Sequence, residues 1–254
     1  MRARRADELG WMRDLLSPLD EILNPVMGVR DWDDAACVEF KGRLIVSADG
    51  PYAKRLVLKS ALIHAAGDVV VKGGTPLFAL DTMIGPEEDV LEMITALKAQ
   101  AEAMMIPLVG GNTLFDDVEP RCSITVAGRL VCNEPVRDNG AEEGDAIVLV
   151  GEPIWGGMEE RIPKAKTLFD TWLQAITEVD FHAAKDVTKG GLRAVVREME
   201  WKSGRKFKLE DNLPYPSGRN LDNFIATLTE HEQAKLEKIC AKNGCRLARI
   251  GRVE

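Results

Sequence analysis

The chain has 254 residues, enough to bury a sizeable core, and this length favours two domains. Apolar residues make up 45% of the sequence and charged residues 29%, which is typical of a soluble globular protein. The formal net charge of -8 argues against a nucleic-acid or anionic-membrane partner, although an acidic site still binds a nucleotide through a divalent cation.

Cysteine usage and hydrophobic segments favour a cytoplasmic protein. The five cysteines are scattered without a Cys-x-x-Cys pair, as reduced thiols are, and packing is a better interpretation of Cys240 and Cys245 than a redox pair. The longest uncharged stretch, 103–115, is too short to span a membrane. No apolar signal core follows the N-terminal arginines. We therefore expect a cytoplasmic location and no membrane partner.

The first half of the chain mixes predicted helices and strands. Apolar residues at helical spacing over 9–23 predict a docking helix. A strand over 42–50 ends in the acidic turn Asp49-Gly50. The further predicted elements are a helix over 53–71, a strand over 77–83, a helix opened by proline and acids after residue 85, and a strand over 122–128.

The second half also mixes helices and strands, and the polar turn 139–144 is the best domain seam. Its predicted elements are strands over 145–151, 224–228 and 246–250, helices over 166–177 and after Gly191, and a helix opened by the capping box Thr229-x-x-Glu232. The sequence thus predicts an α/β (α+β) protein. The expected parts are an N-terminal docking helix at 1–30 and domains over 31–140 and 141–254.

The segment 182–192 combines an acid, two lysines, a hydroxyl group and a glycine pair ahead of an amphipathic run. The pair Gly190-Gly191 lets the backbone approach a ligand closely. The N–H groups and the dipole at the start of the following helix favour an anion. The pattern outlines a phosphate site, although Lys-Gly-Gly is also an ordinary loop sequence.

Four acidic sites lie inside apolar elements or at their ends, and they are candidate ligands of a hard cation. They are the pair Asp33 and Asp34, Asp49 after a strand, Asp68 inside a helix, and Asp186 before the glycine pair. Magnesium binds carboxylate and phosphate oxygens, so these acids could converge on a triphosphate. The alternative for each acid is a turn or surface position. Asp68 fits that alternative least, because apolar residues surround it and burying an unpaired carboxylate is costly.

Seven segments, taken in order, resemble the aminoimidazole ribonucleotide (AIR) synthase superfamily. They are Asp33-Asp34-Ala35-Ala36, Ser47-Ala48-Asp49-Gly50, Gly67-Asp68 leading to Lys72-Gly73-Gly74-Thr75-Pro76, Gly110-Gly111-Asn112-Thr113, Arg137 ahead of Gly144-Asp145, Lys185 to Leu192, and Ile250-Gly251-Arg252-Val253. The superfamily includes thiamine-monophosphate kinase, selenophosphate synthetase and the hydrogenase-maturation dehydratase. The resemblance implies an ATP-dependent enzyme of two α/β domains, usually a homodimer whose N-terminal strands build a shared β-barrel.

The resemblance also implies roles for individual residues. Magnesium ligands correspond to Asp33 or Asp34, Asp49, Asp68 and Asp186, and Asp186 is also a candidate catalytic residue. The residues that look like the nucleotide loop and its contacts are Gly110, Gly111, Asn112, Thr113 and Arg137, and those along the phosphate path are Thr188, Lys189, Gly190 and Gly191. Lys54 resembles a lysine of the corresponding AIR synthase loop and is a candidate catalytic residue that would contact phosphate. A solvated lysine is the equal alternative.

Several departures from the family pattern bear on activity. Asn112 stands where the family usually has an acid, which removes one charge from the cation site. A glycine-rich segment with a reactive cysteine or selenocysteine is missing before Asp33, and no cysteine tail precedes Glu254. We therefore expect neither selenide chemistry nor carbamoyl dehydration. The segment 212–224 is short, so the C-terminal α/β sandwich and its substrate pocket are expected to be reduced.

The sequence therefore predicts an ATP- and Mg2+-binding phosphotransferase-like enzyme, a kinase or synthetase, that acts on an unidentified small molecule as a homodimer. The alternative is a catalytically weak or inactive nucleotide-binding paralogue that serves as a dimeric scaffold or regulator. A purely structural α/β protein with coincidental motifs is the third hypothesis.

Overall fold

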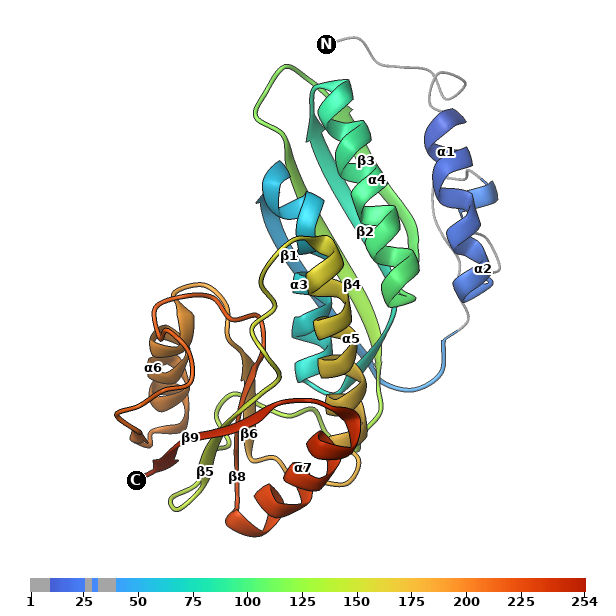
Figure 1. Cartoon of the computed structure of the whole chain (residues 1–254). Coiled ribbons are helices and arrows are strands. Elements are labelled where there is room, and N and C mark those ends of the chain that lie inside the picture. The colour runs from blue at the N-terminus through green and yellow to red at the C-terminus, as the bar shows by residue number, and fades with distance from the viewer. Residues whose placement is uncertain (1–9, 26–28, 32–39) are drawn as a thin grey trace. The chain divides into compact units, whose positions relative to one another are not determined.

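The computed structural model describes residues 10–25, 29–31 and 40–254. The chain divides into two compact units. Unit 1 consists of Met1–Ala66 and Pro76–Arg129, and unit 2 consists of Gly67–Thr75 and Leu130–Glu254. Figure 1 labels the helices and strands of both units. These are compact units and not established domains, so the domain limits 31–140 and 141–254 stay a prediction.

The N-terminal segment is not one docking helix, as predicted, but a series of short helices. They are α1 (Gly10–Leu16), the 3-10 helix η2 (Ser17–Leu19) and α2 (Asp20–Leu23), followed by η3 (Val29–Asp31). Pro18 interrupts the α-helical pattern because it lacks an N–H group. The Asp20 carboxylate accepts hydrogen bonds from the N–H groups of Val29 (3.0 Å) and Arg30 (2.7 Å). The apolar face that suggested docking is nonetheless buried at Met12, Leu16 and Leu19.

Sheet 1, which belongs to unit 1 apart from the ends of two strands, has four strands in the order β1-β4-β2-β3. The strands are β1 (Leu44–Ala53), β2 (Gly74–Gly85), β3 (Leu108–Phe115) and β4 (Arg121–Leu130). β1 is antiparallel to β4, and β2 is parallel to β3. Three of these strands confirm the predicted ones. β3 corrects a prediction, because Gly110 to Thr113 were expected in a loop.

Helices α3 (Lys54–Val71) and α4 (Glu87–Met104) lie on the same side of sheet 1 (Figure 1), and both were predicted. Ser60 interrupts α3 with non-helical dihedral angles, φ -168° and ψ 21°. The buried Gln100 of α4 compensates, because its amide accepts from the Leu62 N–H (3.1 Å) and donates to the Val57 carbonyl (2.7 Å). One polar side chain thus joins the two helices.

Sheet 2, in unit 2, has five strands in the order β6-β8-β5-β9-β7. The strands are β5 (Ala146–Val150), β6 (Ala183–Asp186), β7 (Phe207–Leu209), β8 (Phe224–Leu228) and β9 (Leu247–Val253). Neighbouring strands of this sheet pair in antiparallel fashion. Every residue of β5 and β8 is buried, so both faces of the sheet centre are covered. Ile147 and Leu149 pack with Val195 and Met199 in one core. Trp172 contacts Phe224 at a centroid distance of 5.2 Å in another part of the unit.

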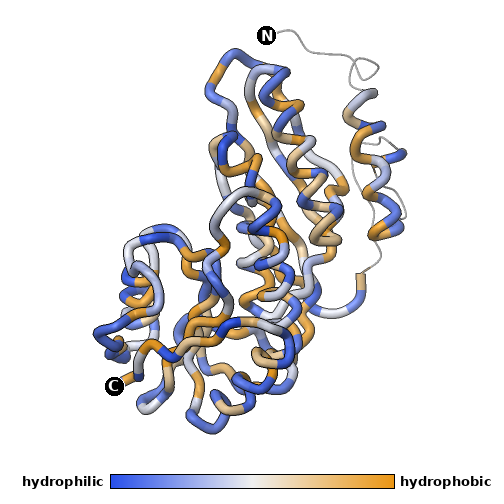
Figure 2. Tube along the Cα trace, viewed as in Figure 1, coloured by the Kyte–Doolittle hydropathy of each residue, from blue (hydrophilic) through white to orange (hydrophobic). Residues whose placement is uncertain are grey.

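The helices of unit 2 are α5 (Met158–Ala175), α6 (Gly191–Ser203) and α7 (Glu230–Asn243). α5 begins eight residues before the predicted start at Lys166, because the Glu160 carboxylate accepts a hydrogen bond from the Gly157 N–H at 2.8 Å and caps the helix ahead of Pro163. The predicted cap of α7 is confirmed, with the Thr229 hydroxyl accepting from the Glu232 N–H at 3.3 Å. Figure 2 shows hydrophilic residues along most of α7. None of the helices in the described ranges is long and apolar enough to cross a membrane.

Candidate functional site

Asp49 lies in β1, at an irregularity in its pairing with β4. Its two carboxylate oxygens accept hydrogen bonds from the Gly50 N–H (2.7 Å) and the Tyr52 hydroxyl (2.5 Å). A Cβ on Gly50, whose φ is +115°, would lie 2.8 Å from the Cys122 carbonyl oxygen, so glycine is required there. The expected reversal after Asp49 is wrong, because the strand continues through this irregularity to Ala53.

The residues expected to form a nucleotide loop instead form the middle of β3. Gly110, Gly111 and Asn112 pair in parallel with Leu80, Asp81 and Thr82 of β2, so backbone hydrogen bonding holds them extended. A Cβ on Gly111 would lie 2.6 Å from both the backbone oxygen and Oδ1 of Asp81. Gly111 therefore makes room for a carboxyl group. Thr113, the last predicted member, is half-buried, and Asn112 is exposed.

Asp81 is a functional candidate that the sequence analysis missed. It is only 5% exposed, and burial raises its pKa to about 7. Its position on β2 alternates with exposed Leu80 and Thr82, so its side chain lies on the same face as buried Ala79 and Met83. An acid in the middle of an apolar strand was the available signal.

Lys54 lies at the first position of α3 and is engaged by two carboxylates of α4. Its ammonium group is 2.5 Å from Asp89 Oδ1 and 2.5 Å from Glu92 Oε2. These hydrogen bonds raise the pKa of Lys54, with that of Asp89 contributing most. A phosphate would have to compete with both carboxylates for this lysine.

Asp68 and Asp186 both belong to unit 2. Asp68 is half-buried in α3, and Asp186 ends β6 with only 7% of its surface exposed. Asp186 pairs with Phe224 in sheet 2, and a Cβ on Gly67 would lie 4.0 Å from the Phe224 ring. The two acids therefore lie in the region of the same aromatic residue.

The predicted glycine pair forms the turn between β6 and α6. Gly190 and Gly191 have φ values of +90° and +70°, and the Gly191 N–H donates to the Thr188 carbonyl at 2.8 Å. A Cβ on Gly191 would lie 2.7 Å from the Arg219 nitrogen and from the Gly218 carbonyl carbon. No larger residue fits this turn without moving the neighbouring backbone. Lys189, at its tip, is exposed.

A cation and an aromatic ring lie beside this turn, and neither was predicted. Leu221 joins the neighbouring loops, because its carbonyl accepts from the Ile154 N–H (2.8 Å) and its N–H donates to the Val187 carbonyl (2.9 Å). The Arg219 guanidinium lies 4.2 Å from the centroid of the Trp155 ring. No sequence signal joined these residues, since the loops that carry them are far apart along the chain.

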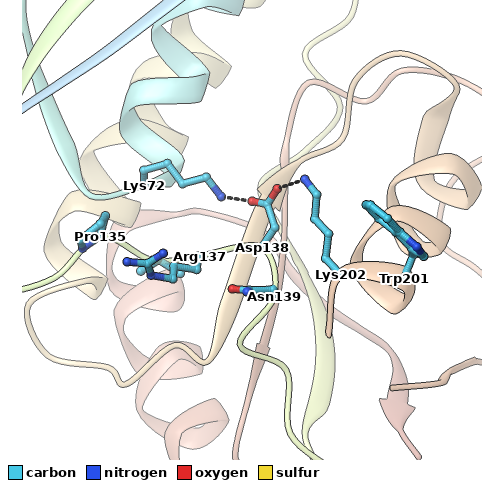
Figure 3. Close-up of a pocket in the computed structure, with 8 residues that line it drawn as sticks. Lys72, Pro135, Arg137, Asp138, Asn139, Trp201 and Lys202 are labelled. Atoms are coloured by element: carbon cyan, nitrogen blue, oxygen red, sulfur yellow. Dashed lines mark hydrogen bonds and ion pairs between the residues drawn. The ribbon is translucent and has the colours of Figure 1, made fainter. Parts of the chain in front are cut away.

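Arg137, which was expected to contact the nucleotide together with Gly110 to Thr113, belongs to unit 2, whereas those residues belong to unit 1. It lines an open pocket of about 630 Å³ together with Lys72, Asp138 and Lys202 (Figure 3). Its backbone carbonyl accepts from the Ala184 N–H at 3.0 Å, which places it beside β6.

The magnesium ligands stay a prediction. Asp33 and Asp34 lie outside the described residues, Asp49 belongs to unit 1, and Asp68 and Asp186 belong to unit 2. Within the described ranges, no three His, Cys, Asp or Glu side chains form a group that could hold a metal ion.

Comparison with known proteins assigns the family. Residues 32–130 match the family model described as AIR synthase related protein, N-terminal domain. An uncharacterised protein of Methanocaldococcus jannaschii is 32% identical over 252 residues, covering 97% of this chain and 84% of that protein. The selenide, water dikinase of Desulfitobacterium hafniense is 28% identical over 233 residues, covering 81% of this chain and 68% of that protein.

A solved structure agrees with the mixed α/β fold of two sheets. The crystal structure of hydrogenase maturation protein HypE in complex with ATP matches with a TM-score of 0.75 at 19% identity, covering 99% of this chain and 87% of that chain. At this identity the likeness concerns the fold alone. The matching family model and the sequence relatives establish that the chain belongs to the AIR synthase-related superfamily.

Proposed function

We propose that this protein is an ATP- and magnesium-dependent enzyme that transfers a phosphoryl group to a small molecule. The observation that carries the proposal is the segment from Asp186 to Gly191. A buried carboxylate ends β6, and a turn that accepts only glycine leads directly into α6. A carboxylate for a cation and the positive end of a helix dipole are two parts that a metal-bound phosphate requires.

The donor set fits magnesium and a nucleotide. Asp49, Asp68 and Asp186 offer oxygen ligands of the kind that this hard cation prefers, and Asn112 offers a neutral oxygen. When bound, magnesium would neutralise negative charge on the phosphoryl group that is transferred. The glycines of β3 would contact the nucleotide, and a solved structure of the same fold holds ATP.

The chain's own residues would orient the phosphates. The positive end of the α6 dipole would attract a phosphate. Gly191 lets the turn close against the backbone of Gly218 and Arg219, which holds the start of α6 in place. Thr188 and Lys189 would contact the phosphate path, and exposed Arg219 adds positive charge beside it. Lys54 would contribute only after release from Asp89 and Glu92.

We also propose that a second copy of the chain covers the open face of sheet 1. Leu44, Val46 and Leu80 are 49%, 54% and 38% exposed. Paired residues of neighbouring strands share a face of the sheet, and consecutive residues of a strand lie on opposite faces. Val46 pairs with Ala127 and therefore lies on the face opposite buried Val126. Leu80 alternates with buried residues of β2 and so lies on the face opposite theirs. All three therefore lie on the face opposite α3 and α4. An apolar patch of this kind marks a protein interface.

ATP binding and ADP release test the proposed activity. We expect ATP with magnesium to give heat in a calorimetric titration and to raise the unfolding temperature, because ligand that binds only the folded state stabilises it. Asp186→Asn should weaken the magnesium-dependent binding about tenfold or more. Asp170→Asn, on the exposed surface of α5, is the matched control and should bind as the wild type does. Absence of both heat and stabilisation at millimolar ATP contradicts the proposal.

A second candidate is a nucleotide-binding scaffold without turnover. It is favoured by the capture of Lys54 between two carboxylates and by the neutral Asn112. A screen of small-molecule acceptors for ADP release separates the two functions. Turnover that is lost in a folded Asp186→Asn variant excludes the scaffold, whereas ATP binding without turnover on any acceptor favours it.

A further inference from the structure

A second cluster of charges in unit 2 surrounds Asp138. Figure 3 shows Lys72 and Lys202 reaching the Asp138 carboxylate from two sides. Lys72 is hydrogen-bonded to Asp138 Oδ1, and Lys202 Nζ lies 2.6 Å from Oδ2. Lys185 lies 3.7 Å from the same oxygen. Although burial alone would raise the pKa of Asp138, these ammonium groups lower it to about 2, so the carboxylate stays charged.

The lysines retain capacity for another ligand. An ammonium group has three N–H donors. Lys202 uses two of them on Asp138 and on Glu198, at 2.6 and 2.5 Å. Lys72 likewise donates to Asp138 and to the Ala184 carbonyl. Within the described part of the chain, each lysine thus has one donor left for another acceptor.

Three further side chains that could contact a ligand line the same pocket. The side chains of Arg137, Asn139 and Trp201 make no hydrogen bond, ion pair or ring contact with the described part of the chain. Trp201 is 81% exposed, although a large aromatic ring gains from being covered. Three cationic side chains and one carboxylate line the pocket, so its local charge is positive in a chain of net charge -8.

We propose that this pocket, which we call the Asp138 groove, binds a small-molecule anion that carries a flat ring. The negative end, a phosphate or a carboxylate, takes hydrogen bonds from Lys202, Lys72 and Arg137. The ring covers the exposed face of Trp201. A volume of about 630 Å³ is within the range of ordinary small-molecule sites. The groove is a second site, distinct from the Gly190-Gly191 turn.

Phenyl phosphate is the probe, because it combines a flat ring with a phosphate and is not a nucleotide. Calorimetric titration should show binding to the full chain, with phenyl phosphate at least about tenfold tighter than inorganic phosphate, since a stacked ring adds affinity. Affinity should fall with added salt, because the charges are partly exposed. A specific small-molecule site should have a dissociation constant well below ~10 mM, so the absence of binding at this concentration of phenyl phosphate overturns the proposal.

Variants assign the binding to the groove. Lys202→Gln should weaken phenyl phosphate about tenfold, whereas Lys206→Gln, an equal charge change on an exposed lysine outside the groove, should not. Trp201→Ser removes a side chain that has no partner among the described residues, and phenyl phosphate should then bind no tighter than inorganic phosphate. Equal affinity of the Lys202→Gln and Lys206→Gln proteins, or an unchanged preference in Trp201→Ser, overturns the assignment.

Competition with ATP separates this proposal from the proposed function. Saturating ATP and magnesium should leave the affinity for phenyl phosphate unchanged, and displacement would show that the groove is not a second site. The Asp186→Asn protein should bind ATP and magnesium about tenfold more weakly and keep phenyl phosphate binding. The loss of ATP binding can therefore be measured separately from the loss of phenyl phosphate binding.

Discussion

Single residues in this protein owe their properties to neighbours that are distant in sequence. Gly191 is enclosed by Gly218 and Arg219, and Asp81 is buried over Gly111. The sequence indicated that a glycine pair follows Asp186. It did not indicate which backbone closes over the second glycine, because that contact depends on how the loops fold together.

Gly191→Ala tests the closed turn. The added Cβ would meet the backbone of Gly218 and Arg219 at 2.7 to 2.8 Å, at a φ of +70° that side chains disfavour. We expect a loss of roughly 2–4 kcal/mol in the free energy of unfolding, measured with urea. Gly218→Ala is the control, since a Cβ there meets nothing within 4 Å. Equal stability of the two variants contradicts this account.

Asp81 should make stability depend on pH. Burial raises its pKa to about 7, against about 4 for an exposed carboxyl, so the folded state keeps a proton that the unfolded state releases. Stability contributed by this group therefore falls as the pH rises from about 4 to about 7 and is level above that.

Asp81→Asn stays neutral at every pH and isolates this effect. Relative to the wild type, the variant should gain roughly 2–3 kcal/mol of unfolding free energy between pH 5 and pH 8. Urea titrations at both values measure it, with the exposed Asp117→Asn as control. If the difference in unfolding free energy between the wild type and the variant does not change with pH, Asp81 is not a buried, protonated carboxyl group.

Helices and strands were predictable where local signals and packing agree. The capping residue Thr229 and the apolar run of β8 gave their elements directly. β3 was missed because Gly110 and Gly111 favour turns in isolation, whereas parallel pairing with β2 keeps them extended. The start of α5 was placed too late, because the Glu160 carboxylate accepts from the Gly157 N–H and so begins the helix eight residues earlier.

Thr229→Ala tests the contribution of a local cap to α7. The variant loses the hydroxyl that accepts from the Glu232 N–H, and we expect unfolding to become easier by about 1 kcal/mol. Thr229→Asp restores an acceptor and should recover most of this loss. Urea unfolding measures both, and equal losses in the two variants would show that the cap is unimportant.

For the whole molecule, the open face of sheet 1 determines the expected assembly. Val46→Lys places a charge on that face, and burying an unpaired charge is costly. We expect light scattering to give half the mass of the wild-type dimer for this variant. Val118→Lys, at a position that is 42% exposed and outside the strands, should leave the dimer intact. A monomeric wild type contradicts the proposed assembly.

The sequence by itself determined the family, the mixed α/β class and most elements, because ordered acids and glycine turns are local patterns that survive without knowledge of contacts. It also pointed to Asp186 and the glycine turn. Only the tertiary structure determined the burial of Asp81, the capture of Lys54, the position of Arg219 beside Gly191, and the gathering of three lysines around Asp138. Each of these depends on residues far apart in the chain, and folding alone brings such residues within hydrogen-bonding distance.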